Sequence, residues 1–165
     1  MKMLEQVLKH FSVHNIGFDY PAEWLEKSLW KEKIKSFIPI IGLFQRSVDY
    51  LVVLEEPKTG INIELTEYVY GFLEEFVNNT IQHYLKDSRI SDITPKEKVN
   101  ITGLGDLDAF KFSFTLNLGH EIIKCDNLLF QRYPWIYQMK ACSLASNYDR
   151  NKKIFDELFN SLVIE

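Results

Sequence analysis

The chain has 165 residues, of which 19 are Lys or Arg and 23 are Asp or Glu, so its formal net charge is −4 at pH 7. This near-balance, without a run of basic residues, argues against the basic face that nucleic-acid-binding proteins usually carry. A chain of this length buries roughly 70% of the surface that its unfolded form exposes, enough for one core without a metal. We therefore expect a single domain over residues 1–165.

The start of the chain and the length of its apolar runs indicate whether it carries a signal peptide or a membrane-spanning helix. Glu5, Lys9 and His10 interrupt the region where a signal peptide needs an unbroken apolar core. No apolar run approaches the roughly 18 residues that a membrane-spanning helix needs. We therefore predict no membrane span and expect a cytoplasmic location.

The first predicted elements are short. Residues 4–11 carry apolar side chains at helical spacing and the next residues alternate, so we expect a helical turn that gives way to a strand. The alternation over residues 16–20 predicts a half-buried strand, which Pro21 ends because proline has no N–H for a ladder. We expect a short helix to begin near Ala22 and to pack Trp24.

Two apolar runs follow. Ser36–Phe44 is apolar on both faces and Tyr50–Leu54 is a second apolar run, which together predict paired strands. Pro39 and Gly42 interrupt the first run, so we expect an edge position or a bulge there.

The middle of the chain predicts a long helix. Thr66 has the chemistry of a helix cap, and the helix is expected to end near Leu85. Its inner face is predicted to contain Val69, Phe72, Leu73, Phe76 and Tyr84. The polar residues Lys86–Lys98 predict a loop or an irregular edge.

A three-stranded antiparallel meander is the clearest prediction. Leu107–Leu118 alternates large apolar side chains with polar ones, which is typical of a strand with one face in the core. Turns at 117–120 and 131–134 separate it from two more strands, at 121–130 and 135–144.

The last predicted element is a helix over Asp149–Leu162, with Asp149 as its cap. Its apolar stripe contains Ile154, Phe155, Leu158, Phe159 and Leu162.

Cys125 and Cys142 are the two cysteines, without the spacing of a zinc or redox motif. If the hairpin turns at Tyr133-Pro134, Cys125 faces Cys142 within reach of a bridge, whereas a turn one residue earlier parts them. Because we expect a reducing cytoplasm, we predict reduced, packed thiols.

The order of these elements resembles the PsbP-like family, which includes the extrinsic PsbP subunit of photosystem II and the Mog-type Ran-binding factors. The positions that carry the resemblance are Phe18, Pro21 and Trp24, then Thr66–Tyr68, then Gly103 or Gly105, then Ile136 and Tyr137 with Ala141, and finally residues 155–161. The resemblance implies an α+β fold, an α/β/α sandwich with a central, mainly antiparallel sheet. It also implies a role in binding other proteins.

Candidate catalytic and metal-binding residues are few. His10 and His14 lie four residues apart, and on a strand this separates them by about 13 Å, too far for two ligands of one ion. Gly103–Asp106 lacks the third glycine and the following helix of a phosphate loop, so we interpret it as a turn. The sequence shows no nucleophile signature, and we predict no catalytic residue, metal or cofactor.

The candidate binding residues are aromatic. Arg132, Tyr133, Trp135 and Tyr137 combine the residue types that dominate interface hot spots. Phe37 and Phe44, in the apolar run, are further candidates for a partner surface. Trp135 and Tyr137 also share a strand face with Met139 and Ala141, the pattern of a core face, so both readings stay open.

These observations favour a non-enzymatic PsbP-like module that binds a protein partner. One alternative is a chaperone that shelters hydrophobic helices in a groove containing Phe37–Phe44. Another is a small-molecule hydrolase whose residues converge from distant positions.

Overall fold

The computed structural model describes residues 7–26, 48–56, 58, 60–68 and 71–165, and for residues 48–50 it describes the backbone alone. The predicted strand Ser36–Phe44 lies outside these residues, and with it the candidates Phe37 and Phe44. The first residues of the predicted N-terminal helical turn also lie outside them.

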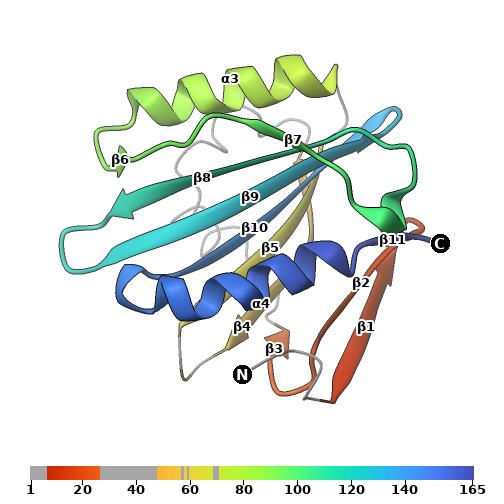
Figure 1. Ribbon diagram of the computed structural model, residues 1–165, viewed down its shortest axis with the longest axis horizontal. Coiled ribbons are helices and arrows are strands. Elements are labelled where there is room, and N and C mark those ends of the chain that lie inside the picture. Colours follow the sequence, from red (N-terminus) through yellow and green to blue (C-terminus); the bar gives the residue numbers. More distant parts are fainter. Residues whose placement is uncertain (1–6, 27–47, 57, 59, 69–70) are drawn as a thin grey trace.

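Most of the described strands form one eight-stranded antiparallel sheet (Figure 1). From edge to edge its main path runs β3 (Leu25–Glu26), β4 (Val48–Glu56), β5 (Ile61–Tyr68), β10 (Trp135–Leu144), β9 (Ile122–Arg132), β8 (Ala109–Asn117) and β6 (Ile90–Ser91). The short strand β7 (Glu97–Val99) pairs with β8 beside this path. The predicted irregular edge over Lys86–Lys98 is thus confirmed as two short strands.

The predicted meander is confirmed as β8, β9 and β10. Phe112 and Phe114 of β8 are buried, whereas Lys111 and Ser113, which precede them, are half-buried, as the alternation predicts. The closing pair Arg132 and Trp135 leaves a two-residue loop between β9 and β10.

The remaining described strands form a small antiparallel sheet, β1 (Leu8–Val13), β2 (Ile16–Pro21) and β11 (Val163–Ile164), in the order β1-β2-β11. The predicted strand at 16–20 is therefore confirmed. The predicted helix from Ala22 is wrong, because the chain turns there, with the Trp24 N–H donating to the Pro21 carbonyl, and then pairs with β4 as β3. Trp24 is nevertheless buried in the core, as expected.

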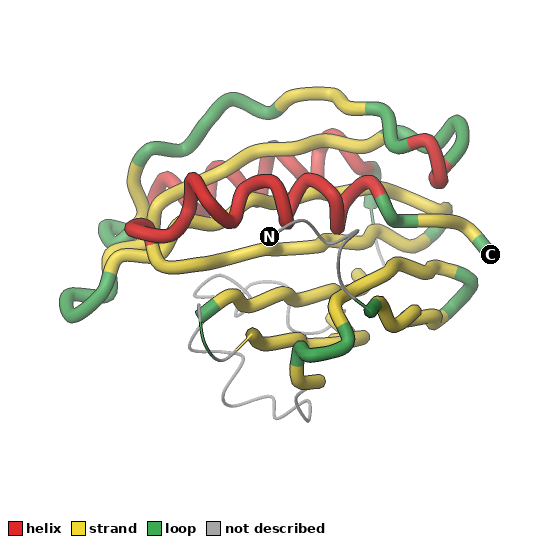
Figure 2. Tube along the Cα trace, turned by 60° about the horizontal axis from the view of Figure 1, so that its bottom comes forward, coloured by secondary structure: helices red, strands yellow, loops and turns green. Residues whose placement is uncertain are grey.

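Two α-helices, α3 (Leu73–Lys86) and α4 (Tyr148–Asn160), occur in the described residues and run along the long strands (Figure 2). The start predicted for α3 is wrong, because Thr66 belongs to β5 and its strand pairs with both neighbours. The helix begins after Gly71, whose φ of +114° is a conformation that favours glycine. Leu73, Phe76 and Tyr84 are buried as predicted, and Val69 lies outside the described residues.

The helix α4 confirms the predicted last helix, with a different cap. Asn147 occupies the N-cap position, and Asp149 lies in the first turn, where its charge favours the positive end of the helix. Within the described residues, neither helix is long and apolar enough to span a membrane.

The sheet separates two apolar cores. On one face, Phe76 and Tyr84 of α3 pack with Phe112 of β8. On the other, Phe155 of α4 packs with Met139 of β10, together with residues of β2. These layers confirm the expected α/β/α arrangement around a mainly antiparallel sheet (Figure 1).

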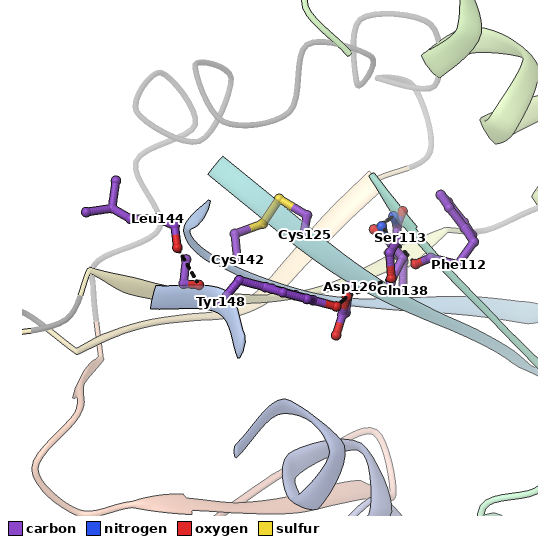
Figure 3. The surroundings of a disulfide bond; sticks show 10 residues. Phe112, Ser113, Cys125, Asp126, Gln138, Cys142, Leu144 and Tyr148 are labelled. Atoms are coloured by element: carbon purple, nitrogen blue, oxygen red, sulfur yellow. Dashed lines mark hydrogen bonds between the residues drawn. A yellow bond between two sulfur atoms is a disulfide. The ribbon is translucent and has the colours of Figure 1, made fainter. Parts of the chain in front are cut away.

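Cys125 and Cys142 lie opposite each other in the β9–β10 hairpin, with their Cα atoms 4.2 Å apart, as the turn at Tyr133-Pro134 predicts. They form a disulfide on the α3 face of the sheet (Figure 3). The expectation of reduced thiols is therefore wrong for this structure. That expectation came from the assumed compartment, whereas directly opposed residues of a hairpin are within reach of each other.

The small sheet is tied together by a cluster that we call the histidine latch, made of His10, Ser12, Asp19 and Glu165. His10 Nδ1 lies 2.7 Å from Asp19 Oδ1, while its Nε2 contacts the Glu165 carboxylate, to which the Ser12 hydroxyl also donates. Hydrogen bonds to Asp19 and Glu165 raise the pKa of His10 above its ordinary value of 6.5. Hydrogen bonds from Ser12 and His10 lower the pKa of Glu165 below its ordinary value of 4.5.

We predict that the disulfide stabilises the fold. It closes a sequence separation of 17 residues, and a loop of this size corresponds to about 3 kcal/mol in the free energy of unfolding. The double variant Cys125→Ala/Cys142→Ala should lose about this amount in urea titrations, and its curve should not respond to reductant. A wild-type curve unchanged by reductant, with reduction verified by mass spectrometry, would contradict the prediction.

We also predict that the histidine latch makes stability depend on pH. Because the pKa of His10 is raised in the folded state, His10 contributes fully to the free energy of unfolding below about pH 6.5. This contribution is lost as the pH rises through the pKa of His10 in the folded protein. A lowered pKa for Glu165 gives stability that is present above about pH 4.5 and is lost as the pH falls. The difference in unfolding free energy between wild type and His10→Gln should therefore be largest at about pH 5–6.

The measurement is denaturant unfolding of both proteins from pH 4 to pH 9, with Lys9→Gln, at an exposed position of β1, as the control. A difference between wild type and His10→Gln that stays constant over this range would refute the electrostatic latch.

Candidate functional site

The predicted binding residues at the β9–β10 turn fall into two groups. Tyr133 is 84% exposed and Trp135 is 37% exposed, so both are available to a partner. Tyr137 is 1% exposed and stacks on Phe130, with ring centroids 5.2 Å apart. It is therefore a core residue, and the prediction that it belongs to a binding surface is wrong. Arg132 is half-buried, and its guanidinium donates to the Asn15 carbonyl oxygen at 3.5 Å.

Phe72 is a third exposed aromatic residue, and it lies on another element. Its side chain is 75% exposed at the N-cap of α3. The Gln131 amide of β9 connects this helix start to the hairpin, because its Oε1 accepts from the Leu73 N–H at 3.2 Å and its Nε2 donates to the Gly71 carbonyl at 2.8 Å. We call Phe72, Tyr133 and Trp135 the aromatic end.

Helical periodicity could not identify Phe72 as part of a surface. The predicted helix began at Thr66 and placed Phe72 on the inner stripe, whereas the real helix begins one residue after it. The bond between Gln131 and Gly71 joins positions 60 residues apart, which no local pattern indicates.

A buried carboxylate lies beneath the aromatic end. Glu67 of β5 is almost fully buried and pairs in register with Tyr137. His14 Nδ1 lies 2.8 Å from Glu67 Oε2. Burial and the hydrogen bond with Glu67 raise the pKa of Tyr137 above its ordinary value of 10. His10 and His14 thus contact different carboxylates, and this arrangement positions the turn between β1 and β2.

A second group of polar side chains lies on the α3 face of the sheet, and sequence reasoning did not single it out. We call it the polar row. Its members are Asn62, Glu64 and Thr66 of β5, Gln138 and Lys140 of β10, and Asn127 of β9. The alternation of β5 resembles that of a strand with one face in water, yet Glu64 is 4% exposed and Lys140 is 3% exposed.

One half of the polar row is fully connected. The Thr66 hydroxyl donates to the Gln138 carbonyl at 3.3 Å, and the Tyr68 hydroxyl donates to Gln138 Oε1 at 3.0 Å. Gln138 Nε2 donates to Asn127 Oδ1 at 2.9 Å, and Asn127 Nδ2 reaches the Phe112 carbonyl at 3.5 Å. These bonds explain how such polar groups are tolerated in the interior.

The other half of the polar row lacks such a hydrogen-bond network in the described residues. Among the described residues, Asn62 Oδ1, Glu64 Oε2 and Lys140 Nζ are buried atoms without a hydrogen-bond partner. Glu64 and Lys140 are register partners across β5 and β10, and Asn62 is paired with Cys142 of the disulfide. Burial raises the pKa of Glu64 and lowers that of Lys140, and in each case the charge of the other residue opposes the shift.

No family model matches the chain, and no curated protein matches it. Several solved structures are similar to it. It is similar to cyanobacterial PsbP (CyanoP) from Synechocystis sp. PCC 6803, with a TM-score of 0.63 and 12% identity over 96% of this chain and 92% of that one. It is similar to LpqN of Mycobacterium tuberculosis, involved in cell envelope biogenesis, with a TM-score of 0.61 and 9% identity over 98% and 93%.

A third similar structure is PA94 of Pseudomonas aeruginosa, a protein of unknown function described as a putative regulator. The TM-score is 0.58 and the identity 8%, over 96% of this chain and 97% of that one. Identities this low show the fold alone, and the fold extends over nearly the whole chain. The chain therefore has the PsbP-like fold that the order of its sequence elements predicts.

Proposed function

We propose that this chain is a non-enzymatic PsbP-like module that binds a protein partner through its aromatic end. The observation that carries the proposal is the exposure of three large aromatic side chains, Phe72, Tyr133 and Trp135, from two elements that the Gln131 amide joins. Tyr and Trp dominate the hot spots of protein interfaces, and exposed aromatic groups on an ordered backbone lose little entropy on binding.

The surroundings of the aromatic end support the same proposal. Arg132 and His14 provide polar and ionisable groups beside it, and a polar rim around an apolar centre is the usual composition of an interface. PA94 is described as a putative regulator and LpqN as involved in cell envelope biogenesis, and either role is compatible with a binding module.

The other expectations stay predictions. The chaperone groove at Phe37–Phe44 lies outside the described residues, and the hydrolase alternative stays a prediction. For the location, the disulfide argues for an oxidising compartment, where such bonds persist, rather than the cytoplasm.

The first step of the test identifies a partner. Affinity capture of the tagged chain from its native cells, followed by mass spectrometry, should give a protein at near-stoichiometric level. That partner is then purified, and its dissociation constant is measured by calorimetry for the wild type and for variants.

We predict that Tyr133→Ser and Trp135→Ser each weaken this affinity at least about 30-fold, the effect of losing a hot spot worth about 2 kcal/mol. The matched control is Ile122→Ser, at the opposite end of β9, whose side chain is also exposed. It should bind like the wild type. Equal affinity in all four proteins would show that the partner binds elsewhere, and failure to capture any partner would count against the binding role.

A further inference from the structure

We propose that the unpartnered half of the polar row, formed by Asn62, Glu64 and Lys140, binds a small amphoteric molecule that carries both an ammonium and a carboxylate group. An α-amino acid has this chemistry. The inference is independent of the aromatic end, and it adds a small-molecule site to the proposed protein-binding role.

The first argument is the inventory of unpartnered atoms. Among the described residues, this part of the α3 face has two buried acceptors, Asn62 Oδ1 and Glu64 Oε2, and one buried donor, Lys140 Nζ. Leaving a buried polar group without a hydrogen bond costs about 1–3 kcal/mol, and more for a charged group. Such groups are retained where something else supplies the partner.

The second argument is that a simple ion pair is available and is not formed. Directly opposed residues of an antiparallel pair have Cβ atoms about 4.5–5.5 Å apart, so Glu64 and Lys140 have the reach to contact each other. They interact electrostatically, yet Lys140 Nζ and Glu64 Oε2 have no hydrogen bond in the described residues. The neighbouring Gln138 and Asn127 side chains are bonded across β10 and β9, so the geometry of this sheet permits contacts between side chains of adjacent strands.

The third argument identifies the class of ligand. An anion alone would satisfy Lys140 and leave the Glu64 carboxylate beside a like charge, whereas a cation alone would have the reverse problem. A molecule with a carboxylate for Lys140 and an ammonium for Glu64 and Asn62 satisfies one donor and two acceptors at once. The adjacent disulfide, which contains Cys142, and the buried Val53 provide apolar surface for its carbon atoms.

The test uses the full chain and the protein amino acids as probes, each at millimolar concentration, with acetate and ethylammonium as single-charge probes. Binding is read as a saturable rise in melting temperature and is then measured by calorimetry. The variants are Glu64→Gln and Lys140→Met, and the matched controls are Glu75→Gln and Lys86→Met, both at exposed positions of α3.

We expect at least one zwitterionic amino acid to bind, with affinity at least tenfold weaker in Glu64→Gln and in Lys140→Met and unchanged in the controls. If either single variant fails to fold, the double variant Glu64→Leu/Lys140→Met replaces it, since apolar replacement of a buried ion pair is often tolerated. The double variant should be folded and should not bind.

Three results would overturn the proposal. The first is that no amino acid binds, and the second is that acetate binds the wild type as tightly as the best zwitterion. The third is an experimental structure in which another segment of the chain donates to Glu64 Oε2 and accepts from Lys140 Nζ.

Discussion

The pairing register between β9 and β10 is the constraint on which the rest of this structure depends. The two-residue loop at Tyr133-Pro134 pairs Arg132 with Trp135, and the ladder then continues to Ile123 and Leu144. Because side chains alternate with a period of two, this register decides which face of the sheet receives each residue. A slip by one residue would exchange the two faces.

Three features follow from this register. Cys125 meets Cys142 and forms the disulfide, and Lys140 lies opposite Asn127 of β9. Tyr133 and Trp135 are left at the tip, beyond the buried part of the hairpin. Both proposed binding regions thus include residues of this hairpin, Tyr133 and Trp135 at its tip and Lys140 on its α3 face.

Buried polar groups on the two faces of the sheet have different hydrogen bonds. On the α4 face, the buried Asp126 accepts hydrogen bonds at Oδ1 from the Tyr148 and Ser113 hydroxyls, at 2.6 and 2.7 Å (Figure 3). Burial and the hydrogen bond with Asp126 raise the pKa of Tyr148, which keeps this donor protonated. On the α3 face, Glu64 and Lys140 have opposite charges and no comparable bonds in the described residues. Asp126 Oδ2, like Glu64 Oε2, has no partner in the described residues, so the two carboxylates differ in the bonds that hold Asp126 through Oδ1 and give it a structural role.

The sequence was most informative where the pattern was local. The alternation of Phe112 and Phe114 with polar neighbours identified β8, and of the two turn positions left open, the one at Tyr133-Pro134 has the cysteine register of the structure. The prediction that a helix starts at Thr66 failed because threonine is favourable both as a helix cap and in a strand. Thr66 lies in a strand because β4 and β10 pair with β5 from both sides.

The candidate site could be predicted only in part. Residue type identified Tyr133 and Trp135, but Tyr137 has the same chemistry and is buried, because exposure depends on distance from the hairpin tip. Nothing in the pattern distinguishes Glu64 and Lys140 from residues that face water, since strand alternation is the same whether the polar face meets solvent or other protein.

The measurement that tests the central claim most directly is the set of Hα–Hα contacts between β9 and β10 in the NMR spectrum of the intact protein. The account predicts contacts for Asn127 with Lys140 and for Leu129 with Gln138, because alternate opposed pairs in an antiparallel ladder bring their Cα atoms to about 4.5 Å. Contacts of Asn127 with Met139 or Ala141 instead would show a slipped register. Such a register would separate the disulfide partners and move Asn127 away from Lys140.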